Sequence, residues 1–118
     1  MLPTELTCEQ QGSQAMLCLR AHAGLFWFRG HYPGQTLLPG VAQVKWVMHY
    51  GRRLLVPDGI FSGVEQITFR HPIKPDDIVT LALDWQAETR QILFTYRLLP
   101  ERIGLGTLAS SGKISLCL

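Results

Sequence analysis

The chain has 118 residues, 47% of them hydrophobic and 17% charged, which suits one globular domain and excludes a disordered polymer. A formal net charge of +2 without any lysine- or arginine-rich run argues against a nucleic-acid partner. The three cysteines form no CxxC pair, so we expect neither a disulfide framework nor a metal site. Neither a signal peptide nor an apolar run of membrane-spanning length is evident, so we expect a cytoplasmic protein without membrane contact.

The first half of the chain predicts one strand and one helix. Residues 1–13 have no clear pattern and are expected to form a loose lead-in, residues 14–21 a strand, and residues 25–28 a short extended piece. The helix is expected over Val41–Leu55, because Pro39 and Gly40 suit its first turn and Pro57 ends it. Apolar residues occur nearly all round this helix, so we expect other structure to wrap it.

The second half changes to the period-two pattern of half-buried strands. Strands are expected over residues 60–70, 79–85, 92–98 and 108–118, with loops between them. One helix against a curved antiparallel sheet is an α+β architecture. Because a sheet of this size covers one side of a helix, we expect a second chain to cover more of it, in a dimer.

The stretch FWFRGHYPGQTLLPGVAQVKW, residues 26–46, contains the main candidate for chemistry. Its prolines and glycines predict that His31 lies on a fixed loop and not in a helix. An imidazole can take and return a proton near neutral pH, so His31 is a candidate acid or base. A lone histidine beside aromatic residues is more often structural, and this pattern alone leaves both roles open.

Two blocks of sequence carry a resemblance to a known family. They are the turn Gly30-His31-Tyr32-Pro33-Gly34 with Pro39-Gly40-Val41 at fixed spacing, and the later stretches GVEQITFR (63–70) and PIKPDD (72–77). Together they resemble the hotdog-fold 3-hydroxyacyl-(acyl-carrier-protein) dehydratases, and Gln43 and Trp46 resemble a dehydratase-like branch of aryl-polyene gene clusters. The resemblance implies a single hotdog domain over residues 1–118, dimeric, in fatty-acid or polyene lipid biosynthesis.

The resemblance also implies roles for three residues in removing water from a 3-hydroxyacyl thioester. His31 matches the base that takes the α-proton, and the Gly40 N–H, at the positive end of the helix, matches the donor to the thioester carbonyl. The family places a carboxylic acid fourteen residues after the histidine, and here that position is Lys45. An ammonium group is a poor proton donor at neutral pH unless burial lowers its pKa.

The replacement by Lys45 leaves several hypotheses open. Lys45 or a nearby carboxylate such as Glu65 could act as the acid in a self-sufficient dehydratase. The chain could instead be an acid-lacking subunit that obtains the acid from a different hotdog chain. It could also bind or hydrolyse acyl thioesters, or be a structural subunit with a decayed site.

Further positions are expected to contact the substrate or its carrier. The substrate-binding candidates are Phe28, Pro39, Val41, Trp46 and Phe61. Met48, Phe69 and Phe94 could also line an acyl tunnel, although each taken singly is more often a core residue. Arg70 and Lys74 are candidates for docking an acidic acyl carrier protein. No cofactor is expected, since the substrate brings its own phosphopantetheine, and His22, His49 and His71 lack metal-ligand spacing.

Overall fold

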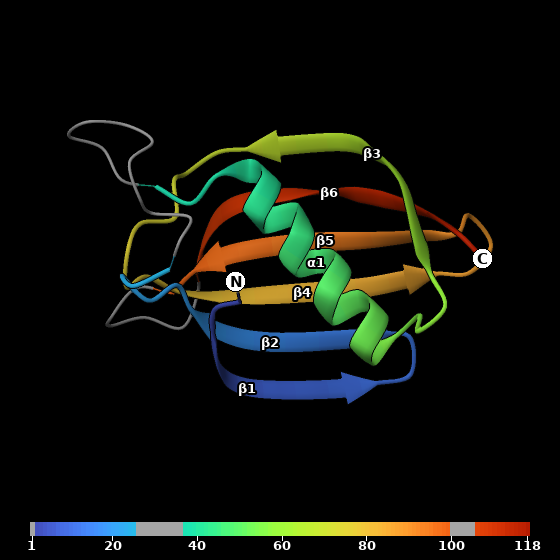
Figure 1. The fold of residues 1–118 in the computed structure, drawn as a ribbon, viewed down its shortest axis with the longest axis horizontal. Coiled ribbons are helices and arrows are strands. Elements are labelled where there is room, and N and C mark those ends of the chain that lie inside the picture. Colours follow the sequence, from blue (N-terminus) through green and yellow to red (C-terminus); the bar gives the residue numbers. More distant parts are fainter. Residues whose placement is uncertain (1, 26–36, 100–105) are drawn as a thin grey trace.

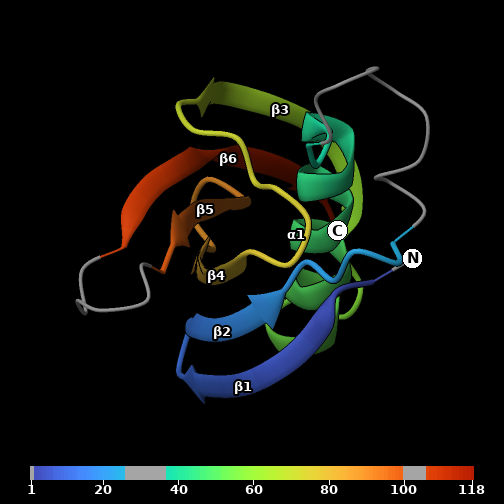
Figure 2. The same ribbon diagram turned by 90° about the vertical axis from the view of Figure 1, so that its left-hand side faces the viewer.

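The computed structural model describes residues 2–25, 37–99 and 106–118. In chain order the elements are β1 (Thr4–Gln11), β2 (Gln14–Arg20), α1 (Gly40–Leu54), β3 (Ile60–Phe69), β4 (Ile78–Gln86), β5 (Gln91–Leu98) and β6 (Thr107–Cys117). The strands form one antiparallel sheet in the order β1-β2-β4-β5-β6-β3. The helix crosses this sheet, and the turned view shows the sheet curving around it (Figures 1 and 2). The α+β prediction is confirmed.

The first strand corrects the expectation of a loose lead-in. β1 pairs with β2 through a two-residue turn, in which Gly12 has a φ of +59° that glycine adopts without steric cost. Every residue of β1 is exposed in the single chain, so its sequence carries little of the apolar alternation that marks a half-buried strand. The Gly12-Ser13 pair was the available signal for this hairpin.

The core lies between one face of α1 and the concave face of the sheet. Trp46 and Tyr50 are its largest helical side chains, each 1% exposed, and they meet strand residues such as Leu81 and Phe94. The opposite face of α1 carries Val41, which is 57% exposed. The sheet of one chain curves around one side of the helix, as Figure 2 shows, and apolar residues such as Val41 stay exposed on the other side.

Strand β3 lies at the edge of the sheet and contains two irregularities. Its pairing with β6 shifts between Phe61 and Gly63 and again between Glu65 and Thr68, and Gln66 has a φ of +53°. Each bulge adds a residue and changes the face that the following side chains present. As a result four apolar residues that do not alternate in sequence all face the helix side: Phe61, Val64, Ile67 and Phe69.

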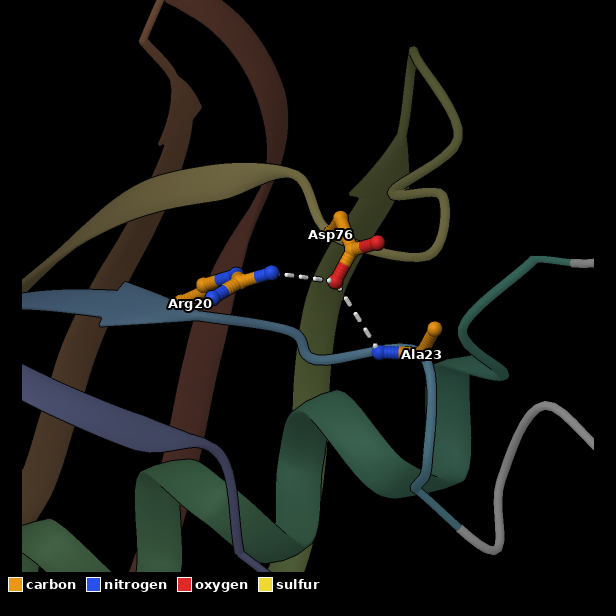
Figure 3. Close-up of polar contacts among 3 residues, drawn as sticks. All are labelled: Arg20, Ala23 and Asp76. Carbon is orange, nitrogen blue, oxygen red and sulfur yellow. Dashed lines mark hydrogen bonds and ion pairs between the residues drawn. The ribbon is translucent and has the colours of Figure 1, made fainter.

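The connection from β3 to β4 is fastened to the end of β2. The Asp76 carboxylate accepts hydrogen bonds from Arg20 (2.9 Å) and from the Ala23 N–H (3.1 Å), as Figure 3 shows. The Asp76 N–H donates to the Ala21 carbonyl, and Asp76 has a φ of +69°. These hydrogen bonds hold the β3–β4 connection against the residues that follow β2.

Candidate active site

The start of α1 presents an unsatisfied backbone donor. Pro39 is the N-cap residue, and its carbonyl accepts the N–H groups of Ala42 (3.1 Å) and Gln43 (3.2 Å). Among the described residues no acceptor faces the Gly40 N–H, and no acidic side chain lies in the first turn. The positive end of the helix dipole is therefore available to a ligand that carries negative charge on oxygen.

A buried polar cluster holds this helix start in place. The Gln43 side chain accepts a hydrogen bond from the Ser110 hydroxyl (2.6 Å) and faces the Leu38 carbonyl with its amide nitrogen (3.4 Å). The Tyr96 hydroxyl donates to the Gln43 carbonyl at 2.7 Å, and burial raises the pKa of Tyr96 well above its ordinary value, so this hydroxyl keeps its proton. The Leu38 N–H donates to the Ile73 carbonyl at 2.7 Å.

A large apolar groove opens from the helix start. Its volume is about 860 Å³, and it runs between the uncovered face of α1 and strand β3. We call it the α1–β3 groove; its lining residues are Gly40, Val41, Val44, Lys45, Met48, His49, Arg52, Gly59, Ile60, Phe61, Val64, Ile67 and Phe69. A smaller hollow of about 260 Å³ adjoins it and is also bounded by Gly40 and Phe69. The groove has the size and apolar lining of a site for an aliphatic chain.

The charged side chains of the α1–β3 groove are all basic. Lys45, His49 and Arg52 lie on the groove face of α1, and none of the described lining residues is a carboxylate. Desolvation and the nearby Arg53 guanidinium lower the pKa of His49, while Glu5 opposes this shift. The part of the site that this structure describes therefore has a backbone N–H at a helix start and an apolar groove, but no acidic side chain in the groove lining.

Comparison with known proteins places the chain in a family. A family model described as ApeI-like, ApeI dehydratase, matches residues 7–112. The chain belongs to the ApeI-like dehydratases. A solved structure titled "The Dehydratase Heterocomplex ApeI:P from Xenorhabdus doucetiae" is 41% identical over 100% of both chains, with a TM-score of 0.89.

More distant comparisons agree with this family. The 3-hydroxyacyl-[acyl-carrier-protein] dehydratase FabZ of Koribacter versatilis is 38% identical over 66 residues, which are 49% of this chain and 42% of that protein. The chain spans about half the length of the curated dehydratases that it matches. The dehydratase domain of the polyketide PpsC from Mycobacterium tuberculosis has a TM-score of 0.69 at 12% identity, covering 99% of this chain and 44% of that one, which shows the shared hotdog fold alone.

The structure brings together several of the residues predicted for this ApeI-like site. Gly40, Lys45, Val41 and Phe61 all line the α1–β3 groove. His31 and Phe28 lie outside the described residues, and their roles stay predictions.

Other predicted residues lie elsewhere. Trp46 is in the core, 1% exposed, and does not line the groove. Pro39 contributes its carbonyl to the helix start and is not a groove residue. Glu65, considered as an alternative acid, accepts a hydrogen bond from Gln91 (3.1 Å) and is likewise outside the groove lining.

The two residues predicted to dock a carrier flank the same connection. Arg70 is exposed and borders the smaller hollow beside Gly40. Lys74 is exposed in the turn before β4, where its N–H donates to the Asp77 carboxylate at 2.7 Å. Between them Ile73 is fully buried, and its carbonyl bonds to Leu38 just before the helix. The connection that carries Arg70 and Lys74 therefore runs beside the start of α1.

Gln43 and His49 were not predicted as site residues, and Phe69 was expected only as a residue that could line an acyl tunnel. Phe69 places its ring against Gly40, Gln43 anchors the first helical turn, and His49 lies one turn after Lys45 on the groove face. The i, i+4 spacing of Lys45 and His49 was the one sequence signal for a shared face. The contacts of Phe69 and Gln43 depend on strand pairing far away in the chain.

Two features are absent from the described residues. No group of three or more histidine, cysteine or acidic side chains within residues 2–25, 37–99 and 106–118 lies close enough to hold a metal ion. No helix in the same ranges is long and apolar enough to cross a membrane.

Proposed function

We propose that the chain is the histidine-bearing subunit of a 3-hydroxyacyl thioester dehydratase, and that a second hotdog chain supplies the general acid. One observation supports this most strongly. The α1–β3 groove joins a helix-start N–H, for which the described residues provide no acceptor, to an apolar channel, yet the lining residues that the structure describes include no carboxylate. Such a site can bind and polarise an acyl thioester, but its described lining contains no carboxylic acid to protonate the departing hydroxyl.

In this proposal each part of the substrate has its own contact. The thioester carbonyl accepts a hydrogen bond from the Gly40 N–H, which stabilises negative charge as it builds on that oxygen. The acyl tail lies along Val41, Met48 and Phe61 in the groove. His31 takes the α-proton, the C–O bond to the 3-hydroxyl breaks, and the partner's acid protonates the oxygen so that water leaves. The products are a 2-enoyl thioester and water.

The open face of the chain supports a second hotdog chain as partner. Among the described strands β3 pairs with β6 alone, so its other edge has no backbone partner within this part of the chain. Its residues Ile60, Phe61 and Phe69 are 66%, 46% and 52% exposed. An apolar edge strand of this kind is normally covered. The ApeI:P structure, which this chain matches over its full length, is by its title a heterocomplex.

Charge favours a partner that differs from this chain. A symmetric pair that covered the groove would present the same surface from both copies, so the Arg52 guanidinium groups of both chains would lie in one interface and repel each other. A partner with acidic residues on its facing surface would remove this repulsion and would also supply the missing acid. We further propose that an acyl carrier protein docks at Arg70 and Lys74 and delivers the substrate, which carries its own phosphopantetheine.

The test measures conversion of a 3-hydroxyacyl N-acetylcysteamine thioester to the enoyl form by the purified chain alone. The parent, His31→Ala, Lys45→Glu and the uncharged control Lys45→Gln are compared. We expect little turnover by the parent, a gain of at least tenfold in Lys45→Glu, and none in Lys45→Gln, because a new carboxylic acid would complete the site of a self-associated chain.

Two other outcomes would refute the proposal in different ways. Parent turnover that disappears in His31→Ala would mean that the chain is self-sufficient and uses a non-standard acid. If no variant converts the substrate while the chain still binds or hydrolyses the thioester, the function is acyl-thioester binding or thioesterase activity and the dehydratase proposal fails.

A further inference from the structure

Two polar side chains are buried within the described core, and they bond to each other. Gln43 is 3% exposed, Ser110 is fully buried, and the bond between them is 2.6 Å long. All their surroundings in this core are hydrophobic or aromatic side chains. This pair lies directly beneath the first turn of α1.

A pair of apolar side chains at positions 43 and 110 would fill the same space without the free-energy cost of burying polar groups. Burying an amide and a hydroxyl requires that their hydrogen bonds be satisfied, and every buried side-chain nitrogen and oxygen of the described residues has a partner. Replacing both members of such a pair by apolar groups of similar shape is often nearly neutral for stability. Packing alone therefore does not explain why this pair is polar, and its position beneath the helix start indicates a role there.

The connections of Gln43 lead to the candidate catalytic donor. Its amide nitrogen faces the Leu38 carbonyl, and Leu38 is followed by Pro39 and Gly40. The Pro39 carbonyl points into the helix, where it accepts the Ala42 and Gln43 N–H groups. In a trans peptide the N–H points opposite to the carbonyl, so the Gly40 N–H points out of the helix start. Gln43 thus holds two successive peptides at the helix start. Its backbone N–H bonds to the carbonyl of the Pro39–Gly40 peptide, and its side-chain amide faces the carbonyl of the preceding Leu38–Pro39 peptide.

We infer that Gln43 is a positioning residue that fixes the direction of the Gly40 N–H, with Ser110 orienting the Gln43 amide. This inference rests on the proposed function, in which the Gly40 N–H binds the thioester oxygen. A preorganised donor stabilises developing charge because it need not reorient during the reaction, and displacement of such a group by about 1 Å costs roughly 100-fold in rate. Loss of Gln43 should therefore lower kcat more than it raises KM.

The experiment compares Gln43→Met, Ser110→Ala, the double variant Gln43→Met/Ser110→Ala, and the control Ile114→Val. Ile114 lies on β6 like Ser110 and is fully buried, so its loss of a methylene disturbs the same strand without touching the helix start. Each substitution is made in whichever assembly shows His31-dependent turnover, either the chain with its partner or the Lys45→Glu chain. Thermal unfolding, kcat and KM are measured separately for each.

We expect the double variant to regain most of the thermal stability that Ser110→Ala loses, because it leaves no unsatisfied buried amide. Its kcat should stay about 10- to 100-fold below that of the parent assembly, with KM changed by less than about threefold. Ile114→Val should keep its kcat within about twofold. A double variant with kcat within twofold of the parent would show that Gln43 is an ordinary core residue.

A second readout does not depend on turnover. The chain contains eleven glycines, so selective labelling with ¹⁵N-glycine gives a short set of amide signals in which Gly40 can be assigned. The Gly40 signal should shift or broaden in Gln43→Met/Ser110→Ala and stay in place in Ile114→Val. An unmoved Gly40 signal in the double variant would overturn the inference about Gln43. If the signal moves but no assembly shows His31-dependent turnover, only the proposed dehydratase function fails.

Discussion

Substitution of Gly40 by alanine separates the catalytic role of the helix start from its structural role. A Cβ atom at this position would lie 2.5 Å from the Cζ atom of Phe69 and 3.1 Å from both Cε atoms of its ring. Ordinary carbon contacts are about 3.5–4.0 Å, so the ring must retreat by roughly 1 Å. Phe69 is 52% exposed at the end of an edge strand, which allows this movement through its side-chain torsions.

The expected cost in stability is small. Displacing the ring costs about 1 kcal/mol, the lower end of the range for overpacking, because the ring is not enclosed. Alanine is favoured over glycine in a helix by up to about 1 kcal/mol, which offsets much of this cost. We therefore expect the free energy of unfolding of Gly40→Ala to lie within about 1 kcal/mol of the parent.

The expected cost in activity is much larger. The added methyl group and the displaced ring both crowd the approach to the Gly40 N–H, and loss of one such donor typically costs about 10²–10³ in kcat, or about 2.7–4 kcal/mol. The assay is the thioester conversion described above, with urea unfolding in parallel. Gly40→Ala/Phe69→Leu is the control, because it relieves the contact with the ring while keeping the methyl group beside the N–H.

Two results would refute this reasoning. If Gly40→Ala keeps its kcat within threefold, the Gly40 N–H is not the carbonyl donor. If the double variant regains full activity, the loss came from the displaced Phe69 ring and not from the covered N–H. We expect neither, since the double variant should regain stability and stay inactive.

Three further substitutions test the fold around the site. The Asp76→Gly variant should be about 1 kcal/mol more stable to urea unfolding than the Asp76→Ala variant. Both variants lose the exposed ion pair to Arg20, but alanine keeps the backbone strain at φ +69° and glycine does not. Equal stabilities of the two variants would contradict this prediction. Gly51→Ala should lower the free energy of unfolding by about 1 kcal/mol, because the new Cβ would lie 2.6 Å from the Ile92 Cδ1 atom. Ile92→Val alone should lower the thermal midpoint of the parent. The same substitution made in Gly51→Ala should raise the midpoint, because it removes the crowded atom. Burial and Glu5 raise the pKa of Tyr50 to about 12, so the hydroxyl loses its proton at lower pH in the unfolded chain than in the folded one. The free energy of unfolding should therefore fall as pH rises from about 10 to 12. Tyr50→Phe should flatten this fall, and an unchanged slope would show that Tyr50 is not its cause.

The sequence was sufficient to predict most of the elements and the general place of the site. The helix was expected over residues 41–55 and begins at Gly40, because proline and glycine mark a helix start by local geometry alone. The strands after residue 60 were expected from alternation of apolar residues, which follows from the two faces of a sheet. Lys45 was expected at the site from the resemblance to the dehydratase family, and it lines the α1–β3 groove.

Tertiary structure decided what distant parts of the chain contribute. β1 has an exposed sequence and is a strand because β2 pairs with it. The bulges of β3 set which of its apolar residues face the helix, against simple alternation. Trp46 lies in the core rather than in the groove because the sheet covers that side of α1.

The same distinction explains why Gln43 was not predicted as a site residue. Its partners Ser110 and Tyr96 lie 67 and 53 positions away in the chain. Local propensity and periodicity extend over a few residues, so they can predict a helix start and the residue types in its first turn. The contacts that fix the direction of the Gly40 N–H arise only when β5 and β6 fold beneath that turn, and they are therefore a property of the tertiary structure.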